Sequence, residues 1–153
     1  FTPVRDRLEP LGDIDGATYI NDTTATAPAA AAAALRAMDR PVVLIAGGSE
    51  KRTDFDEFAR EVAAPGRVKA LVLLDGDTTP RLREAVLAAG YDAGAIRGPA
   101  RSMDEAVRLA ADLAAPGDVV LLSPAAASFG MFRNEFHRGD EFRAAVARLG
   151  GQG

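Results

Sequence analysis

The most regular pattern along the chain is an alternation of short, wholly apolar runs with longer segments of helical character. The apolar runs are Pro41–Ala46, Val68–Leu74 and Val119–Leu122. The segments predicted as helices are Ala29–Met38, Phe55–Ala63, Pro80–Ala89, Met103–Leu113 and Asp140–Leu149, with a short strand expected at Ala95-Ile96. Runs that are apolar on both faces are typical of parallel strands buried between two layers of helices.

The beginning of the chain follows a different pattern. Leu8–Asp13 and Ala17–Asn21 are short enough to be strands, and Asp15-Gly16 between them is a turn signal, so a hairpin is expected. The whole pattern predicts an α/β protein: a Rossmann-like, three-layer open sheet, mostly parallel, with helices on both faces and a short β-hairpin at the N-terminus.

In open α/β sheets, ligands bind beyond the carboxyl ends of the strands. The most unusual local sequences of this chain lie at those predicted ends. They are Asn21-Asp22-Thr23, Gly47-Gly48-Ser49-Glu50-Lys51, Asp75-Gly76-Asp77 and Ser123-Pro124. The binding edge is therefore expected there on topology alone, although Asp75 and Asp77 are interpreted as a turn rather than a metal site.

Composition narrows the classes of function. The 153 residues suffice for one domain with a real core, and the net charge of −4 argues against a nucleic-acid binder. The absence of Cys excludes disulfides and thiolate metal sites and fits a reducing cytoplasm. A single His makes a His-based metal site unexpected. No apolar run is long enough to cross a membrane, and no signal peptide is visible.

The stretch from Leu121 to Phe129 has the character of a binding loop. An apolar strand ends in Ser123-Pro124, and three alanines then lead to Ser128 and an aromatic residue. Small residues let a ligand approach the backbone closely. Ser128 lacks both a triad partner and a G-x-S-x-G elbow, so it is expected to hydrogen-bond a ligand oxygen or to cap a helix rather than to act as a nucleophile.

Lys51 follows the turn at Gly47-Gly48. Only two of the 18 basic residues are Lys, and a Lys after a Gly-rich turn suggests a compact charge that faces an anion. A solvated loop Lys is equally compatible with this position. The segment is not a Walker A loop, because no Gly directly precedes the Lys. The glycine pair is better explained by a tight turn or a close approach of backbones.

Two further segments carry candidate residues with two readings each. Thr26 either caps the following helix or meets a ligand carboxylate at the helix start. Asp22 either accepts a hydrogen bond from a ribose hydroxyl or closes a turn.

Near the C-terminus, His137 is expected to be a surface or capping residue, and Arg138-Gly139 is expected to end one helix before the next begins at Asp140.

Taken together, four segments resemble motifs of the Mur ligase C-terminal domain, in the same order along the chain. The matches are Asp6-Arg7-Leu8-Glu9 with His-Arg-x-Glu, Asn21-Asp22-Thr23-Thr24-Ala25-Thr26 with Asn-Asp-Ser-Lys-Ala-Thr, Gly47–Phe55 with Gly-Gly-x-x-Lys-x-x-Asp-Phe, and Leu122–Gly139 with Leu-Ser-Pro-Ala-x-Ala-Ser, Phe-Lys-Asn and Arg-Gly. Within this family the motifs are most similar to those of the D-glutamate-adding ligases.

The resemblance implies an ATP-dependent amide ligation in peptidoglycan precursor synthesis in the cytoplasm. ATP phosphorylates the carboxylate of UDP-MurNAc-L-alanine, and the amine of D-glutamate attacks the acyl phosphate. The C-terminal domain would bind D-glutamate and close over ATP. By resemblance, Thr26, Lys51, Ser128 and Phe129 contact D-glutamate, whereas Arg7 and Asp22 contact ATP. Catalytic residues and Mg²⁺ ligands are expected in a central domain outside these residues, and the enzyme is expected to be a monomer.

The same comparison divides the chain into a linker from a missing central ATPase domain at residues 1–9, the D-glutamate-binding domain at 10–150 and a tail at 151–153. The start at Phe1 rather than Met is consistent with a fragment of a longer protein. The alternatives are the C-terminal domain of another Mur ligase or of a folylpolyglutamate synthase relative, or a non-catalytic Rossmann-like binding module.

Three positions depart from the family motifs. Asp6 stands in place of His, and Thr24 stands in place of Lys, which removes a positive charge near the nucleotide edge. Glu135-Phe136 reverses the order in which the family has an aromatic residue and Glu. The aromatic substrate contact is therefore either taken over by Phe136 or lost.

Overall fold

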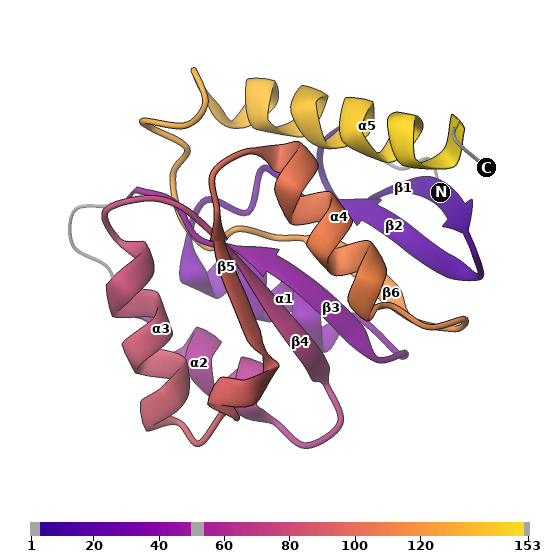
Figure 1. The fold of residues 1–153 in the computed structure, drawn as a ribbon. Coiled ribbons are helices and arrows are strands. Elements are labelled where there is room, and N and C mark those ends of the chain that lie inside the picture. Colours follow the sequence, from indigo (N-terminus) through magenta and orange to yellow (C-terminus); the bar gives the residue numbers. More distant parts are fainter. Residues whose placement is uncertain (1–3, 50–53, 152–153) are drawn as a thin grey trace.

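A computed structural model describes residues 4–49 and 54–151. Within these residues the chain forms one open sheet of six strands in the order β1-β2-β6-β3-β4-β5 (Figure 1). The strands are β1 (Glu9–Ile14), β2 (Ala17–Asn21), β3 (Val42–Ala46), β4 (Val68–Leu74), β5 (Ile96–Ala100) and β6 (Val119–Leu122). β1 and β2 form an antiparallel hairpin, and every other neighbouring pair is parallel. The predicted fold class is confirmed.

The helices lie in two layers, one on each face of the sheet (Figure 1). Their bounds are α1 (Pro28–Arg36), α2 (Asp56–Ala63), α3 (Thr79–Ala88), α4 (Met103–Leu113) and α5 (Glu135–Gly151), and a 3₁₀ turn, η1, spans Ala93–Ala95. α1, α2 and α3 contribute to one core cluster, whereas α4 and α5 contribute to the other.

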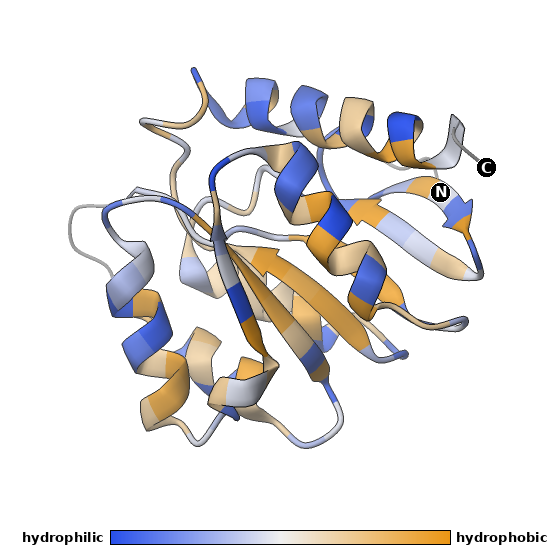
Figure 2. Ribbon diagram, viewed as in Figure 1, coloured by the Kyte–Doolittle hydropathy of each residue, from blue (hydrophilic) through white to orange (hydrophobic). Residues whose placement is uncertain are grey.

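The central strand β3 shows why the apolar runs have no polar face. Val42, Leu44 and Ala46 belong to the core beneath α1–α3, and Val43 and Ile45 belong to the core beneath α4 and α5. Alternate side chains of a strand point to opposite faces, so a strand covered twice must be apolar at every position. Figure 2 shows this as a hydrophobic sheet, with polar residues on the outer faces of the helices.

The helix starts follow local rules. Pro28 opens α1, where its missing N–H has no helical partner, and alanines with high helix propensity follow it. Ser102 caps α4, because its side chain accepts a hydrogen bond from the Glu105 backbone N–H at 3.1 Å. Thr26 does not cap α1: the residue before the helix is Ala27, which makes no side-chain cap. The expected capping role of Thr26 is therefore wrong.

The C-terminal helix differs most from the prediction. α5 begins at Glu135 rather than Asp140, so Arg138 and Gly139 lie inside it and do not end a helix. Both residues are buried against the rest of the domain, and this packing keeps the helix continuous through the glycine.

The strand expected at Ala95-Ile96 begins at Ile96 and is longer than predicted, because β5 pairs with β4 from Ile96 to Ala100. No helix in residues 4–49 and 54–151 has the length and apolar character needed to span a membrane.

Candidate functional site

The loops that follow β2, β3 and β6 meet at one edge of the sheet. β6 lies between β2 and β3, and its last residue, Leu122, pairs with Asn21 on one side and Ile45 on the other. The last strand of the chain is thus flanked by the second and the third. The loops that the sequence predicted at the binding edge thus lie around the loop that starts at Ser123.

The loop after β3 is fixed between two other loops. Its Gly48 carbonyl accepts from Thr78 N at 3.1 Å, and Gly48 N donates to Thr79 Oγ1 at 3.2 Å. On the other side, Ser49 N donates to the Ala127 carbonyl at 3.0 Å. A Cβ on Gly48 would lie 2.3 Å from that carbonyl oxygen, and a Cβ on Gly76 would lie 2.2 Å from the Gly48 oxygen. The glycines are required by close backbone approach, as the sequence suggested. Lys51 itself lies outside the described residues.

The loop after β6 presents the two residues that the sequence singled out there in different ways. Ser128 is buried, whereas Phe129 is 69% exposed. Ser49 Oγ donates to the Phe129 carbonyl at 2.5 Å, which ties this loop to the glycine turn. Phe129 and Ser49 border a pocket of about 620 Å³ whose other lining residues are Asp75, Gly76, Asp77, Arg101, Gly130 and Met131.

Arg138 joins the edge loops from beneath. Its guanidinium is wholly buried and donates to the carbonyl oxygen of Thr23 at 2.7 Å, to Thr23 Oγ1 at 2.9 Å and to the carbonyl oxygen of Ala126 at 2.9 Å. Burial lowers the pKa of Arg138 to about 10, so the side chain is still ionised at neutral pH. One cation on α5 therefore holds the loop after β2 against the loop that carries Ser128. Sequence reasoning interpreted this residue as a helix end, and only its place in the Arg-Gly motif could have indicated another role.

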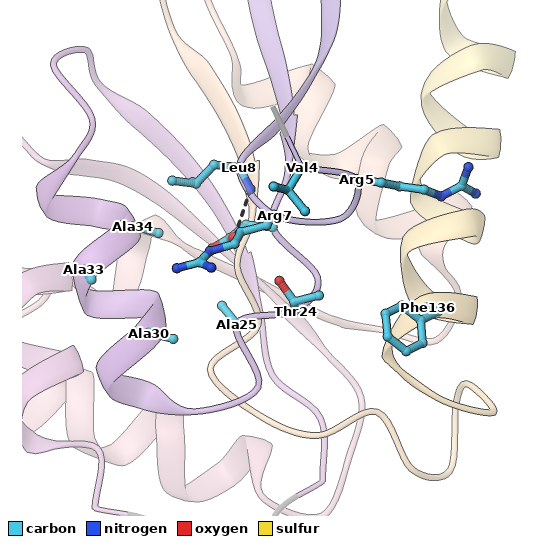
Figure 3. Close-up of a pocket in the computed structure, with 11 residues that line it drawn as sticks. Val4, Arg5, Arg7, Leu8, Thr24, Ala25, Ala30, Ala33, Ala34 and Phe136 are labelled. Carbon is cyan, nitrogen blue, oxygen red and sulfur yellow. Dashed lines mark hydrogen bonds between the residues drawn. The ribbon is translucent and has the colours of Figure 1, made fainter. Parts of the chain in front are cut away.

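A second pocket, of about 580 Å³, lies on the other side of the β2 loop (Figure 3). Arg7 reaches into it toward the alanines of α1, and Phe136 of α5 stands at the side away from α1. The remaining lining residues are Val4, Arg5, Leu8, Asp22, Thr24, Ala25, Ala30, Ala33 and Ala34. The structure thus brings Arg7 and Asp22 together, as the sequence-based assignment to one ligand requires. It also places Phe136 here, on the Arg7 side, rather than beside Ser128.

Asp22 is only 4% exposed and is held by internal contacts. Its Oδ1 accepts from Leu8 N at 3.0 Å, and its Oδ2 accepts from Ser123 Oγ at 2.9 Å. Burial raises the pKa of Asp22, although the Ser123 and Leu8 hydrogen bonds and the nearby Arg7 charge act in the opposite direction. Each oxygen retains one further lone pair, so a ligand hydroxyl at the pocket could still donate to this carboxylate.

Thr26 borders neither of these two pockets. It is partly exposed, and its N–H donates to the Thr24 carbonyl at 2.8 Å. The neighbouring Ala25 carbonyl accepts from Ala125 N at 3.0 Å, which links the Thr26 segment to the loop after β6. His137 is partly buried; its Nδ1 accepts from Arg133 N at 3.1 Å, and its Nε2 is 3.0 Å from Glu141 Oε1.

This geometry defines a class: an open α/β domain with two pockets at the carboxyl edge of its sheet, separated by loops that a buried arginine holds together. The family profile described as "Mur ligase, glutamate ligase domain" matches residues 6–126. The chain belongs to this family of Mur ligase glutamate ligase domains.

Curated relatives are similar over nearly the whole chain. A UDP-N-acetylmuramoylalanine–D-glutamate ligase of Roseiflexus sp. is 55% identical over 95% of this chain, and one of Symbiobacterium thermophilum is 51% identical over 97%. The matched regions are 31% and 32% of those proteins, so the chain spans about a third of the length of the curated relatives.

A solved structure has the same fold. It is a domain of a UDP-N-acetylmuramate:L-alanyl-gamma-D-glutamyl-meso-diaminopimelate ligase from Haemophilus ducreyi, with a TM-score of 0.56 and 20% identity. The match covers 91% of this chain and 99% of that one. At this identity the likeness bears on the fold alone, and it agrees with the Rossmann-like α/β architecture.

Proposed function

We propose that this chain is the C-terminal domain of the ATP-dependent ligase that adds D-glutamate to UDP-MurNAc-L-alanine in peptidoglycan precursor synthesis. The observation that carries the proposal is the 55% identity, over 95% of the chain, to a relative named as a D-glutamate ligase. The same name recurs at 51% and 45% identity, which favours this ligase over other Mur ligases and folylpolyglutamate synthases. In this proposal the domain binds D-glutamate and closes over ATP.

The pocket around Arg7 and Asp22 suits the nucleoside end of ATP. Arg7 is exposed, and within the described residues its guanidinium forms no hydrogen bond or ion pair, so it is available to an anion. Asp22 retains lone pairs for ribose hydroxyls, and the alanines of α1 offer an apolar wall for a base. ATP would supply the phosphoryl group that activates the carboxylate of UDP-MurNAc-L-alanine.

The D-glutamate side would be built from Thr26, Lys51, Ser128 and Phe129. A dicarboxylate needs a cation and neutral donors in a preorganised site. Lys51 supplies the cation, the hydroxyls of Thr26 and Ser128 supply donors, and Phe129 supplies an exposed aromatic wall. The attack of the D-glutamate amine on an acyl phosphate is accelerated mainly by proximity and orientation. The role of this domain in catalysis would therefore be to position the amine and to exclude water.

Mg²⁺ and the UDP moiety are assigned to other parts of the complete ligase. In the part of the chain that the structure describes, no group of three or more His, Cys, Asp or Glu residues is arranged to hold a metal ion. The proposal, which follows the family resemblance, places the metal beside the ATP phosphates in a central domain and the reaction in the cytoplasm, where UDP-linked substrates would meet ATP. The ligase is proposed to act as a monomer without a nucleic-acid or membrane partner.

Lys51→Ala in the complete ligase tests the assignment of the D-glutamate site. Loss of the cation should raise KM for D-glutamate by about tenfold or more and leave KM for ATP nearly unchanged. Steady-state phosphate release measures both constants. Arg83→Ala, which removes an exposed cation from α3, is the matched control and should leave both unchanged. An unaltered KM and kcat for D-glutamate in Lys51→Ala would overturn the assignment.

A further inference from the structure

The segment that precedes β1 has an unusual backbone. Asp6 and Leu8, the neighbours of Arg7, both have left-handed conformations, with φ of 68° and 43°. Residues with a side chain rarely adopt this region, so the surroundings must hold them there. With a left-handed residue on either side of it, Arg7 projects its side chain out of the segment and into the pocket of Figure 3.

Contacts from the β2 loop fix part of this segment. The Asp6 carbonyl accepts from Thr24 N at 3.2 Å and from Thr24 Oγ1 at 2.9 Å, and Leu8 N donates to Asp22. Asn21 Nδ2 donates to Asp6 Oδ1 at 2.9 Å and to Glu9 Oε1 at 3.1 Å. The two carboxylates that flank Arg7 thus converge on one amide, and their negative charges need a further partner.

Arg143 of α5 is the cation that both carboxylates share, whereas the exposed Arg5 lies 3.8 Å from Asp6 Oδ2 alone. Its Nη1 lies 2.8 Å from Asp6 Oδ1 and 2.8 Å from Glu9 Oε1, so a single nitrogen bridges the residues before and after Arg7-Leu8. Its Nη2 pairs with Asp140 on the same helix, which orients the guanidinium. α5 can come this close because Gly139, one turn earlier, faces Asp6: a Cβ there would lie 2.3 Å from Asp6 Oδ1.

We propose that Arg143 is a positioning residue for nucleotide binding: by clamping Asp6 and Glu9, it holds the left-handed segment that presents Arg7 to the ligand. This inference rests on the proposed function, in which Arg7 contacts ATP. Arg143 does not line the Arg7 pocket. It acts through Arg7, and its contribution disappears when Arg7 is absent.

The test is a double-mutant cycle in the complete ligase, read as KM for ATP and KM for D-glutamate. Arg143→Gln is expected to raise KM for ATP roughly tenfold with little change in KM for D-glutamate. Arg143→Lys keeps a cation between the carboxylates and is expected to restore most of the affinity. In an Arg7→Ala background, Arg143→Gln is expected to change KM for ATP by less than about twofold. Arg148→Gln, on the same helix but paired with Asp104 of α4, is the control and should leave KM for ATP unchanged.

The outcomes separate this inference from the proposed function. A wild-type ligase without D-glutamate-dependent ATP cleavage contradicts the proposed function. An active wild type with an unchanged KM for ATP in Arg143→Gln overturns the positioning role, as does an effect of equal size in the presence and absence of Arg7. If Arg143→Gln fails to fold, Arg143→Met, which keeps much of the side-chain volume but removes the cation, takes its place in the cycle. A rise in KM for ATP that vanishes in the Arg7→Ala background supports the role, and either no rise or a rise that persists there refutes it.

Discussion

Asp22 shows how one side chain at this edge serves two purposes. It is buried and closes the junction between Leu8 and Ser123, yet it borders the pocket into which Arg7 projects. The two interpretations of its sequence position, a turn-closing residue and a ligand acceptor, are thus geometrically compatible. Burial raises the pKa of Asp22 from its ordinary value of 3.8, so folding favours the protonated carboxyl over the carboxylate. The ionised form is retained at a cost in stability.

Asp22→Asn should therefore stabilise this chain at pH 7, by about 1 kcal/mol or less. The pKa of Asp22 is higher in the folded than in the unfolded state, so the wild-type chain has the full stability of a neutral group at this position only below the unfolded-state pKa. This part of the free energy of unfolding is lost as the pH rises through the folded-state pKa. The amide can accept from Leu8 N and donate to Ser123 Oγ, so both contacts survive. Urea unfolding at pH 7 and pH 3.5 should show a higher free energy of unfolding for Asp22→Asn than for wild type at pH 7 alone. A variant less stable than wild type at pH 7 contradicts this prediction.

At the scale of elements, the site depends on loops that are fixed to one another. The glycine turn after β3, the Asp75-Gly76 loop after β4 and the loop from Ser123 to Phe129 share backbone hydrogen bonds or contacts too close for a side chain. Arg138 of α5 adds the loop after β2 to this group. A buried cation that donates only to carbonyl and hydroxyl groups stabilises one arrangement of these loops, because each acceptor would otherwise be unpaired in the interior.

Arg138→Met should destabilise the chain by about 2–4 kcal/mol. Methionine fills much of the volume but leaves the Thr23 and Ala126 carbonyls without their donor. Chemical denaturation measures the loss, and Arg133→Met, at an exposed position just before the helix, should change stability by less than about 0.5 kcal/mol. Equal stability of the two variants would show that the buried guanidinium does not hold the loops.

Sequence patterns predicted elements best where burial alone decides them. β4, β6 and α4 begin and end at the predicted residues, because an apolar run or an amphipathic stripe bounded by turn residues has one solution in a layered fold. The start of α5 could not be predicted, because a glycine after an arginine is a common helix end. Gly139 is kept inside this helix by its packing against Asp6. The edge of the site followed from topology, whereas the roles of Arg138 and Arg143 depend on contacts more than 100 residues apart in sequence.

For the whole molecule, the proposed function implies that this chain cannot act alone. The isolated chain should fold but release no phosphate from ATP in the presence of D-glutamate, because the loop for the ATP phosphates and the site for the UDP substrate are assigned elsewhere. Circular dichroism checks the fold, and a phosphate-release assay checks activity, with the complete ligase as the positive control. D-glutamate-dependent phosphate release by the isolated chain would contradict the division of labour proposed for this enzyme.

The place of β6 has a consequence for how the molecule is made. The strand that leaves the ribosome last among the six is a central one, and it alone connects the β1–β2 hairpin to the other strands of the described sheet. Its first pair joins residues 18 and 119, so the hairpin has no neighbouring strand in the described sheet until residue 119 has been synthesised. Such distant pairings form slowly, and unpaired edges invite association with other chains. The two halves of the ligand edge can therefore meet only after the loop from Ser123 to Phe129 has been synthesised, because this loop lies between them.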